Sequence, residues 1–229
     1  MSINPLHLPV KKDVDTIRKT VLTNIVKMLN NRKWISDKNV DKYIETITNV
    51  QNDDQIYKVH LDVSLSNVET YYPVEPNEER KKEKDFEDNV VMIKLLPQKI
   101  TSIGKSPIIM EFFNNYKKYH RILIVDSISE KTKQQAMSVK HIEVFTEPFF
   151  MLDLMEIVCS PQYEVLTPKE GEELLKSYFM TKRQMKKMWD NDPASLYFCL
   201  KKKQIVRIIR NSELSGKSID YRIVVPKSG

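Results

Sequence analysis

The chain of 229 residues is poor in the side chains that bind metals and in glycine: it has two cysteines, four histidines and four glycines. Cys159 and Cys199 lie far apart, and neither has a partner at zinc-ligand spacing, so we expect two reduced, structural thiols. The tripeptide Gly-Lys-Ser occurs twice, at 104–106 and 216–218, but the earlier glycine of a phosphate-binding loop is Lys99 or Asn211. The sequence therefore predicts no metal and no cofactor.

Long apolar runs are also missing. The run at 147–155 contains acidic residues and is far shorter than the roughly 20 residues of a membrane-spanning helix. The first 15 residues lack the basic and then apolar pattern of a secretory signal. We expect a soluble intracellular protein that has no membrane partner.

Catalytic signatures are equally scarce. The nucleophile motif G-x-S-x-G does not occur. A magnesium-dependent nuclease needs a carboxylate two residues before a lysine at a strand end, but Met92 precedes Lys94. Glu79-Arg80-Lys81 has that spacing within a charged loop, where chance matches are common. We assign no catalytic, cofactor-binding or metal-binding residue and expect no small-molecule substrate.

Charge divides the chain in two. Residues 161–229 contain 14 basic and 8 acidic side chains, which accounts for the whole net charge of +6, and residues 1–160 are balanced. An apolar content of 41% is enough for a core in each part. We therefore expect an N-terminal domain over 1–160 and a C-terminal domain over 161–229.

The N-terminal domain alternates strands and helices, which favours an α/β fold with a central sheet flanked by helices. An apolar stripe at helical spacing predicts the first helix, and Ser36 is a plausible N-cap for the second. Residues 66–89 contain two prolines and dense mixed charge, which indicates a loop or insertion. The stripe consists of Val14, Ile17, Val21, Ile25 and Met28. We expect strands within 58–65, 90–96, 121–126 and 141–145, and helices within 106–119 and 129–137.

The C-terminal domain should be a small α/β unit that ends in β-strands. Thr167 and Glu170 form a capping box, and Thr181 can cap a short helix that reaches Trp189. Asp192 before Pro193 is an N-cap followed by proline at the first helical position. Two β-rich segments, 204–210 and 219–225, follow with Gly216 as the turn residue between them.

Basic side chains are interspersed with apolar ones in this last segment. Because successive side chains of a strand point to opposite faces of the sheet, a basic residue and the apolar residue next to it would face opposite ways. They could bind phosphate, face an acidic protein or be solvated, and periodicity alone leaves these alternatives open. The residues concerned are Lys201, Lys202, Lys203, Arg207, Arg210, Lys217 and Arg222.

The stretch NDPASLYFCLKKKQIVRIIRNSELSG (191–216) resembles a known pattern, D-P-[VA]-x-x-Y followed by [LI]-K-R-G-[QE]-V-V-[KR]-I-I-R, x-S-E-T-[AS]-G and Y-R. The matching positions are Asp192, Pro193, Ala194, Tyr197, Leu200, Lys201, Gln204, Val206, Arg207, Ile208, Ile209, Arg210, Ser212, Glu213, Ser215, Gly216, Tyr221 and Arg222. The pattern belongs to the fifth-largest common subunit of eukaryotic nuclear RNA polymerases and to its archaeal counterpart. Lys203 replaces its glycine and Asn211 its proline. Weaker resemblance in 17–36 and at 121–126 implies a eukaryote-type protein with both domains. Scarce glycine, lysine in place of arginine and the loss of N-terminal family motifs suit either an AT-rich eukaryote or a large DNA virus.

The resemblance implies a non-catalytic subunit of a DNA-directed RNA polymerase, with an assembly domain on the largest subunit and a jaw domain near downstream DNA. Expected partner-binding residues are Asp192, Pro193, Arg207, Arg210, Ser212, Glu213 and Arg222, and expected DNA-proximal residues are Lys131 and Lys133. The location would be the nucleus for a cellular protein and the virion or host cytoplasm for a viral one, towards which we lean. The alternatives are a free-standing nucleic-acid-binding protein and a degenerate nuclease.

Overall fold

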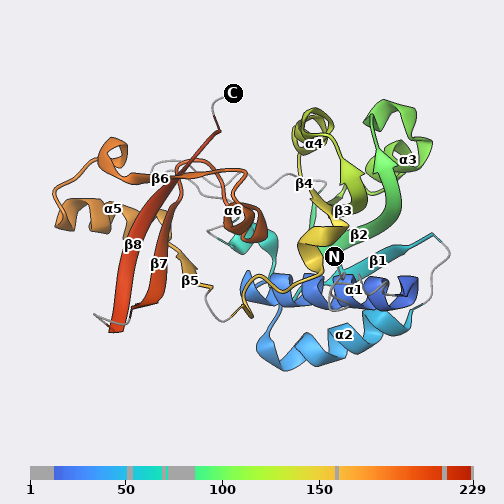
Figure 1. Ribbon diagram of the computed structural model, residues 1–229, viewed down its shortest axis with the longest axis horizontal. Helices are drawn as coiled ribbons and strands as arrows, with labels where there is room; N and C mark the ends of the chain where they lie inside the picture. Colours follow the sequence, from blue (N-terminus) through green and yellow to red (C-terminus); the bar gives the residue numbers. More distant parts are fainter. Residues whose placement is uncertain are drawn as a thin grey trace, which may run out of the picture.

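The computed structural model describes residues 13–50, 54–68, 71, 86–157, 160–212 and 216–227. Two four-stranded mixed sheets lie side by side, and helices flank both of them (Figure 1). Both sheets mix parallel and antiparallel pairs, which confirms the expected mixed α/β fold class.

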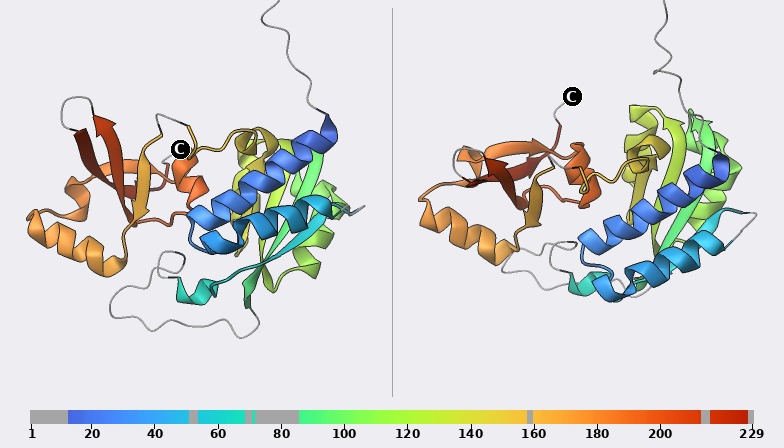
Figure 2. Two further views of the ribbon diagram at one scale, coloured as in Figure 1. Left: turned by 90° about the horizontal axis from the view of Figure 1, so that it is seen from below. Right: turned by 60° about the horizontal axis from the view of Figure 1, so that its bottom comes forward.

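The first sheet has the strand order β1-β2-β3-β4, with β2, β3 and β4 parallel and β1 antiparallel at the edge. Helices α3 and α4 connect the parallel strands across one face, and α1 and α2 cover the other face (Figure 2). The strands are β1 (Ile56–His60), β2 (Glu87–Ile100), β3 (Tyr119–Ile128) and β4 (Ile142–Thr146). The helices are α1 (Val14–Asn31), α2 (Val40–Asn49), α3 (Pro107–Asn115) and α4 (Glu130–Met137).

The apolar stripe of α1 faces the sheet over most of its length. Val21, Ile25 and Met28 are almost completely buried, and Ile17 packs against the same cluster. Val14, which the spacing places on the stripe, is the first residue of the helix and is 73% exposed. Short 3-10 turns complete this part of the chain: η2 (Asp37–Asn39), η3 (Leu65–Asn67), η4 (Ile103–Lys105) and η5 (Glu147–Phe150).

The second sheet has the order β5-β7-β8-β6, in which β7 and β8 form an antiparallel hairpin and β6 runs parallel to β8. Its elements are β5 (Gln162–Val165), α5 (Pro168–Ser177), η6 (Lys182–Gln184), β6 (Lys186–Trp189), α6 (Pro193–Tyr197), β7 (Ile205–Ser212) and β8 (Gly216–Val225). Helix α5 lies on one face, where Gly171 permits close approach: a Cβ there would stand 3.2 Å from Cδ1 of Ile205.

Three expected elements differ from the structure. The capping box at Thr181 opens only the turn η6, and the chain then extends into β6 because pairing with β8 outweighs the helical pattern. The strand expected within 58–65 lies at Ile56–His60, so that it begins two residues earlier and ends five residues before Leu65, which belongs to η3. The strand β2 begins at Glu87 and so includes the end of the expected loop 66–89, of which 69–70 and 72–85 lie outside the described residues.

Candidate functional site

The short helix α6 forms as its sequence predicts. The Asp192 carboxylate accepts a hydrogen bond from the backbone N–H of Ala194 at 2.9 Å, and Pro193 occupies the first helical position, where a missing N–H has no cost. The Ser195 hydroxyl donates to the carbonyl oxygen of Trp189 at 2.7 Å, which ties the helix to β6. Asp192 and Pro193 therefore define the position of α6, and Pro193 itself is exposed.

The turn after α6 is built without glycine. Lys203 has a φ of +70°, the left-handed conformation in which the matching pattern has a glycine. The N–H of Gln204 donates to the carbonyl of Lys201 at 3.2 Å, and the N–H of Lys203 donates to the carbonyl of Val224 at 2.9 Å. The Gln204 side chain closes the turn by accepting from the N–H of Lys201 at 2.6 Å. Lys203 thus adopts the strained left-handed conformation, which is stabilised by its own bond to Val224 and by the bonds between Lys201 and Gln204.

The three arginines expected to bind a partner lie on two different faces of the second sheet. Arg207 stands opposite Tyr221 on the face that α5 covers, next to Ile205. Its guanidinium pairs with Glu164 at 3.0 Å and lies 5.6 Å from the centre of the Tyr221 ring. The side chain is still 38% exposed.

Arg210 and Arg222 lie on the other face, because successive strand residues alternate. Arg222 pairs with Asp220 at 3.2 Å, and Asp220 also holds Lys186 at 2.8 Å. Arg210 is exposed and makes no hydrogen bond or ion pair with the described parts of the chain. Both arginines oppose the rise that burial and Asp192 cause in the pKa of the Tyr163 phenol. The charges of Asp192, Arg210 and Arg222 therefore all act on the Tyr163 phenol.

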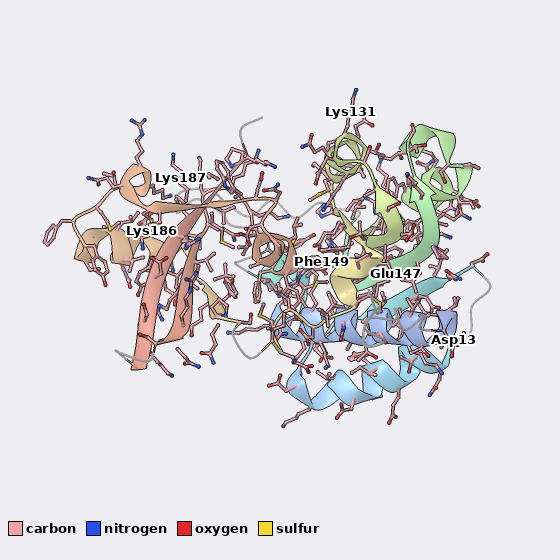
Figure 3. The ribbon with its side chains drawn as sticks, viewed as in Figure 1. Asp13, Lys131, Glu147, Phe149, Lys186 and Lys187 are labelled. Atoms are coloured by element: carbon pink, nitrogen blue, oxygen red, sulfur yellow. The ribbon has the colours of Figure 1, made fainter. Side chains whose placement is uncertain are left out.

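The other expected site residues are less closely grouped. Ser212 ends β7 opposite Gly216, and Glu213 lies outside the described residues. Lys131 is exposed on α4, on the first sheet and away from Lys186 and Lys187 of β6 (Figure 3). Lys133 is half-buried on the same helix, and burial lowers its pKa although Glu130 opposes the change. The structure thus brings only part of the expected set together.

A buried polar junction between the two sheets was not expected. Arg32, just after α1, donates to the carbonyl oxygens of Tyr197 at 2.6 Å and Leu196 at 3.0 Å, at the end of α6. The side chain of Asn31 donates to the Tyr197 hydroxyl at 2.8 Å. Tyr197 and Cys199 are buried in the apolar cluster of α1 and α2. Residues at the end of α1 therefore fix the position of α6 against the N-terminal part of the chain.

A carboxylate neutralises Arg32 inside this junction. Glu143 on β4 binds Arg32 through both oxygens at 2.7 Å and also accepts from Nε2 of His120 at 2.7 Å. The hydroxyl of Tyr71 lies 2.7 Å from Nδ1 of His120, which suits a neutral ring that donates to Glu143 and accepts from Tyr71. Lys201 reaches the same group, with its ammonium 5.4 Å from the centre of the Tyr71 ring.

The surroundings of the junction shift the pKa values of its titratable side chains. Burial disfavours the ionised form of Glu143, but the Arg32 guanidinium and the His120 hydrogen bond outweigh it and keep the pKa of Glu143 well below its ordinary value. Burial lowers the pKa of His120, and the Glu143 carboxylate opposes this only in part. Burial also raises the pKa of Tyr197 to about 12. At neutral pH the junction thus contains one buried ion pair with a neutral imidazole beside it.

The described residues do not form a nuclease site at Lys94, a metal site or a membrane-spanning helix. Lys94 of β2 donates to the carbonyl oxygen of Asp54 at 3.1 Å instead of standing beside a carboxylate pair. The described residues contain no group of three His, Cys, Asp or Glu side chains placed to hold a metal ion. Their helices are also too short or too polar to cross a bilayer.

Comparison with known proteins identifies the family that the second sheet resembles. Residues 152–224 match the family described as "RNA polymerase Rpb5, C-terminal domain", a range that spans the second sheet with α5 and α6 almost to the end of β8. The second sheet is thus similar to the C-terminal domain of that family.

Relatives extend this match over the first sheet. The chain is 30% identical to "DNA-directed RNA polymerase subunit 5" of Acanthamoeba polyphaga mimivirus, over 98% of this chain and 100% of that protein. It is 22% identical to "DNA-directed RNA polymerase V subunit 5C" of Arabidopsis thaliana, over 75% and 76%. It is 35% identical to "DNA-directed RNA polymerases I, II, and III subunit RPABC1" of Caenorhabditis elegans, over 45% and 51%. The chain therefore belongs to the Rpb5 family, which confirms the resemblance seen in the sequence.

Proposed function

We propose that this chain is a non-catalytic subunit of a multisubunit DNA-dependent RNA polymerase. In this proposal the second sheet docks on the largest subunit as an assembly domain, and the first sheet forms a jaw near downstream DNA, with Lys131 and Lys133 towards the DNA. The observation that carries the proposal is the 30% identity to a viral polymerase subunit 5, which covers both sheets. The protein would be found wherever its polymerase is: the nucleus for a cellular enzyme, the virion or host cytoplasm for a viral one.

The hairpin of the second sheet offers a docking surface. Among the described residues, β5 pairs with β7 only as far as Ile209, and β6 pairs with β8 only from Arg222 onwards. Residues 210–212 and 216–221 therefore extend beyond their neighbouring strands, so that their outer backbone edges and the exposed residues 210, 211 and 216–219 can meet a partner. Arg210 contributes an exposed positive charge there, and no described residue forms an ion pair with it, so an acidic partner surface would complement it.

The buried junction supports the second half of the proposal. Docking of one sheet can place the other only if the two are joined rigidly. The ion pair of Arg32 with Glu143, and the bonds from Arg32 to the carbonyls of α6, lie in an apolar surround and fix the two sheets to each other. A subunit that docks through the second sheet would thereby carry the first sheet in a defined direction.

Charge reversal in the hairpin tests the docking surface. The full chain with Arg210→Glu or Arg207→Glu is co-expressed with the largest polymerase subunit from the same source, and co-purification is measured at several salt concentrations. We expect Arg210→Glu to weaken co-purification more, because Glu164 already neutralises much of the charge of Arg207. Lys131→Glu is the matched control, since it changes the charge equally on the distant helix α4 (Figure 3).

Two results would contradict the proposal. One is undiminished co-purification of a folded Arg210→Glu variant. The other is a wild-type chain that elutes alone from a native extract and binds DNA in a salt-dependent way, which would favour a free-standing nucleic-acid-binding protein.

A further inference from the structure

One aromatic side chain combines an unfavourable backbone with complete exposure. Six non-glycine residues have a positive φ within the described parts of the chain: Lys33, Gln55, His141, Phe179, Cys199 and Lys203. Phe179 has a φ of +50° and is 96% exposed, whereas Cys199, the other apolar member of the set, is buried in the core. Packing explains the residue type at Cys199 but not at Phe179.

Phe179 follows the end of α5, at a position that glycine usually occupies. The N–H of Phe179 donates to the carbonyl of Lys176 at 3.2 Å, and the N–H of Met180 donates to that of Leu175 at 3.0 Å. These two bonds define a Schellman motif, in which the left-handed residue is commonly glycine because a side chain crowds the backbone there. A benzyl group at this position costs stability twice, through its backbone and through its contact with water.

Basic residues predominate in the sequence around Phe179, although one of them, Lys186, pairs with Asp220 at 2.8 Å. Residues 174–189 contain Lys176, Lys182, Arg183, Lys186 and Lys187 and no acidic residue. The neighbouring Tyr178 is 62% exposed, and its ring centre lies 6.2 Å from that of Tyr221. The turn between α5 and η6 lies at the end of the molecule farthest from the first sheet (Figure 1), with Lys186 and Lys187 on the adjacent strand (Figure 3). A partner can reach it without meeting the first sheet.

We propose that Phe179 is an anchor residue that inserts into an apolar pocket on an acidic surface of the largest polymerase subunit. This inference rests on the proposed function and locates one contact within it. A large aromatic side chain that becomes buried in a pocket, with polar residues at the rim, is the arrangement of a binding hot spot, where few groups contribute most of the affinity. Strain at the anchor is tolerated in the free chain because burial in the complex offsets it.

A protein partner fits this surface better than a nucleic acid. Single-stranded nucleic acid is bound along grooves where several aromatic rings stack on successive bases. Here the ring of Phe179 is 96% exposed just after the end of α5, and that end of the helix points away from the first sheet (Figure 2). Such a projection suits a pocket, and the basic residues around it suit carboxylates at the rim of that pocket.

Glycine substitution separates binding from folding. Lys33 is a matched control: it has a φ of +61°, is exposed and forms the same motif after α1, where it donates to Asn30 at 2.7 Å and Trp34 donates to Leu29 at 3.0 Å. We expect Phe179→Gly and Lys33→Gly to raise the melting temperature of the full chain alike, by about 2–4 °C. Only Phe179→Gly should weaken binding to the largest subunit, by roughly 30-fold or more in Kd.

Two further variants test the chemistry of the contact. Phe179→Leu keeps an apolar side chain and should retain most of the affinity. Lys182→Glu should weaken binding, and the loss should shrink as salt concentration rises. Together these results would support an apolar anchor within a basic rim.

Three outcomes would overturn the inference. Unchanged affinity of Phe179→Gly, or equal weakening by Phe179→Gly and Lys33→Gly, would show that the ring is not an anchor. If Phe179→Gly lost binding to a single-stranded oligonucleotide but still bound the largest subunit normally, the ring would be assigned to nucleic-acid binding instead. Failure of the wild-type chain to bind the largest subunit would refute the proposed function itself and is seen before any variant is compared.

Discussion

The buried ion pair of Arg32 with Glu143 should be costly to break from one side. Glu143→Gln keeps the shape of the side chain but leaves the Arg32 guanidinium buried without a counter-charge. Removing one partner of a buried pair typically costs about 3–5 kcal/mol. We expect a loss in this range in the free energy of unfolding in urea, with a fall of roughly 6–12 °C in melting temperature for a loss of about 3 kcal/mol.

A double-mutant cycle separates the pair from its surroundings. Arg32→Met removes the guanidinium, and Arg32→Met with Glu143→Gln removes both charges. Since the double variant buries no unpaired charge, its loss should be smaller than the sum of the single losses by about 2–3 kcal/mol. The exposed pair of Arg207 with Glu164 is the control, and Glu164→Gln should cost less than about 1 kcal/mol.

Additive losses would refute this reasoning. If the two single losses sum to the loss of the double variant within about 0.5 kcal/mol, Arg32 and Glu143 do not stabilise each other. A loss from Glu143→Gln no larger than that from Glu164→Gln would show equally that the junction does not depend on its buried charge.

Two further predictions concern single side chains. Burial lowers the pKa of His120 in the folded chain, so the unfolded chain takes up the proton at higher pH. The free energy of unfolding should therefore fall as pH falls below about 6.5, by at most about 1.4 kcal/mol per pH unit. In the His120→Gln variant this free energy, measured by urea unfolding at pH 7, 6 and 5, should depend less on pH. An unchanged slope in that variant would contradict the assignment. Lys203→Gly should stabilise the chain by about 1 kcal/mol, since φ is +70° there; thermal unfolding checks this, and a lower melting temperature would show that the lysine side chain contributes more than its strain costs.

Local signals in the sequence predict the elements that depend on near neighbours. The stripe of α1 and the cap of α6 at Asp192 need only residues within a few positions, and both form as expected. The family pattern marks Lys203 as the position of a glycine, which leaves open whether the lysine adopts the left-handed conformation or the turn changes; the structure shows a φ of +70°.

Long-range pairing decides what the sequence does not predict. Residues 186–189 lack the alternation of a half-buried strand, and they form β6 only because β8 runs beside them. Glu143, by contrast, occupies a predicted strand, yet nothing local indicates that it meets Arg32, 111 residues earlier in the chain. Its signal was a charged residue in an otherwise apolar strand, which often marks a buried pair.

The sequence names candidate site residues but does not give their arrangement. Family resemblance indicated Arg207, Arg210 and Arg222, and strand periodicity indicated that alternate residues face opposite ways. The register of β7 against β8 then separates Arg207 from the other two. That register depends on the whole hairpin, so the sequence could name these residues without grouping them.

The position of α6 also affects the order in which the chain can fold during synthesis. Tyr197 and Cys199 belong to the apolar cluster of α1 and α2, although they come from the last third of the sequence. The N-terminal sheet therefore cannot complete its own core until the ribosome has released residues near 200, and until then the surface around Trp34 and Arg32 stays open. A nascent chain stalled before α6 would present this surface to chaperones, and release of the remaining residues would close it.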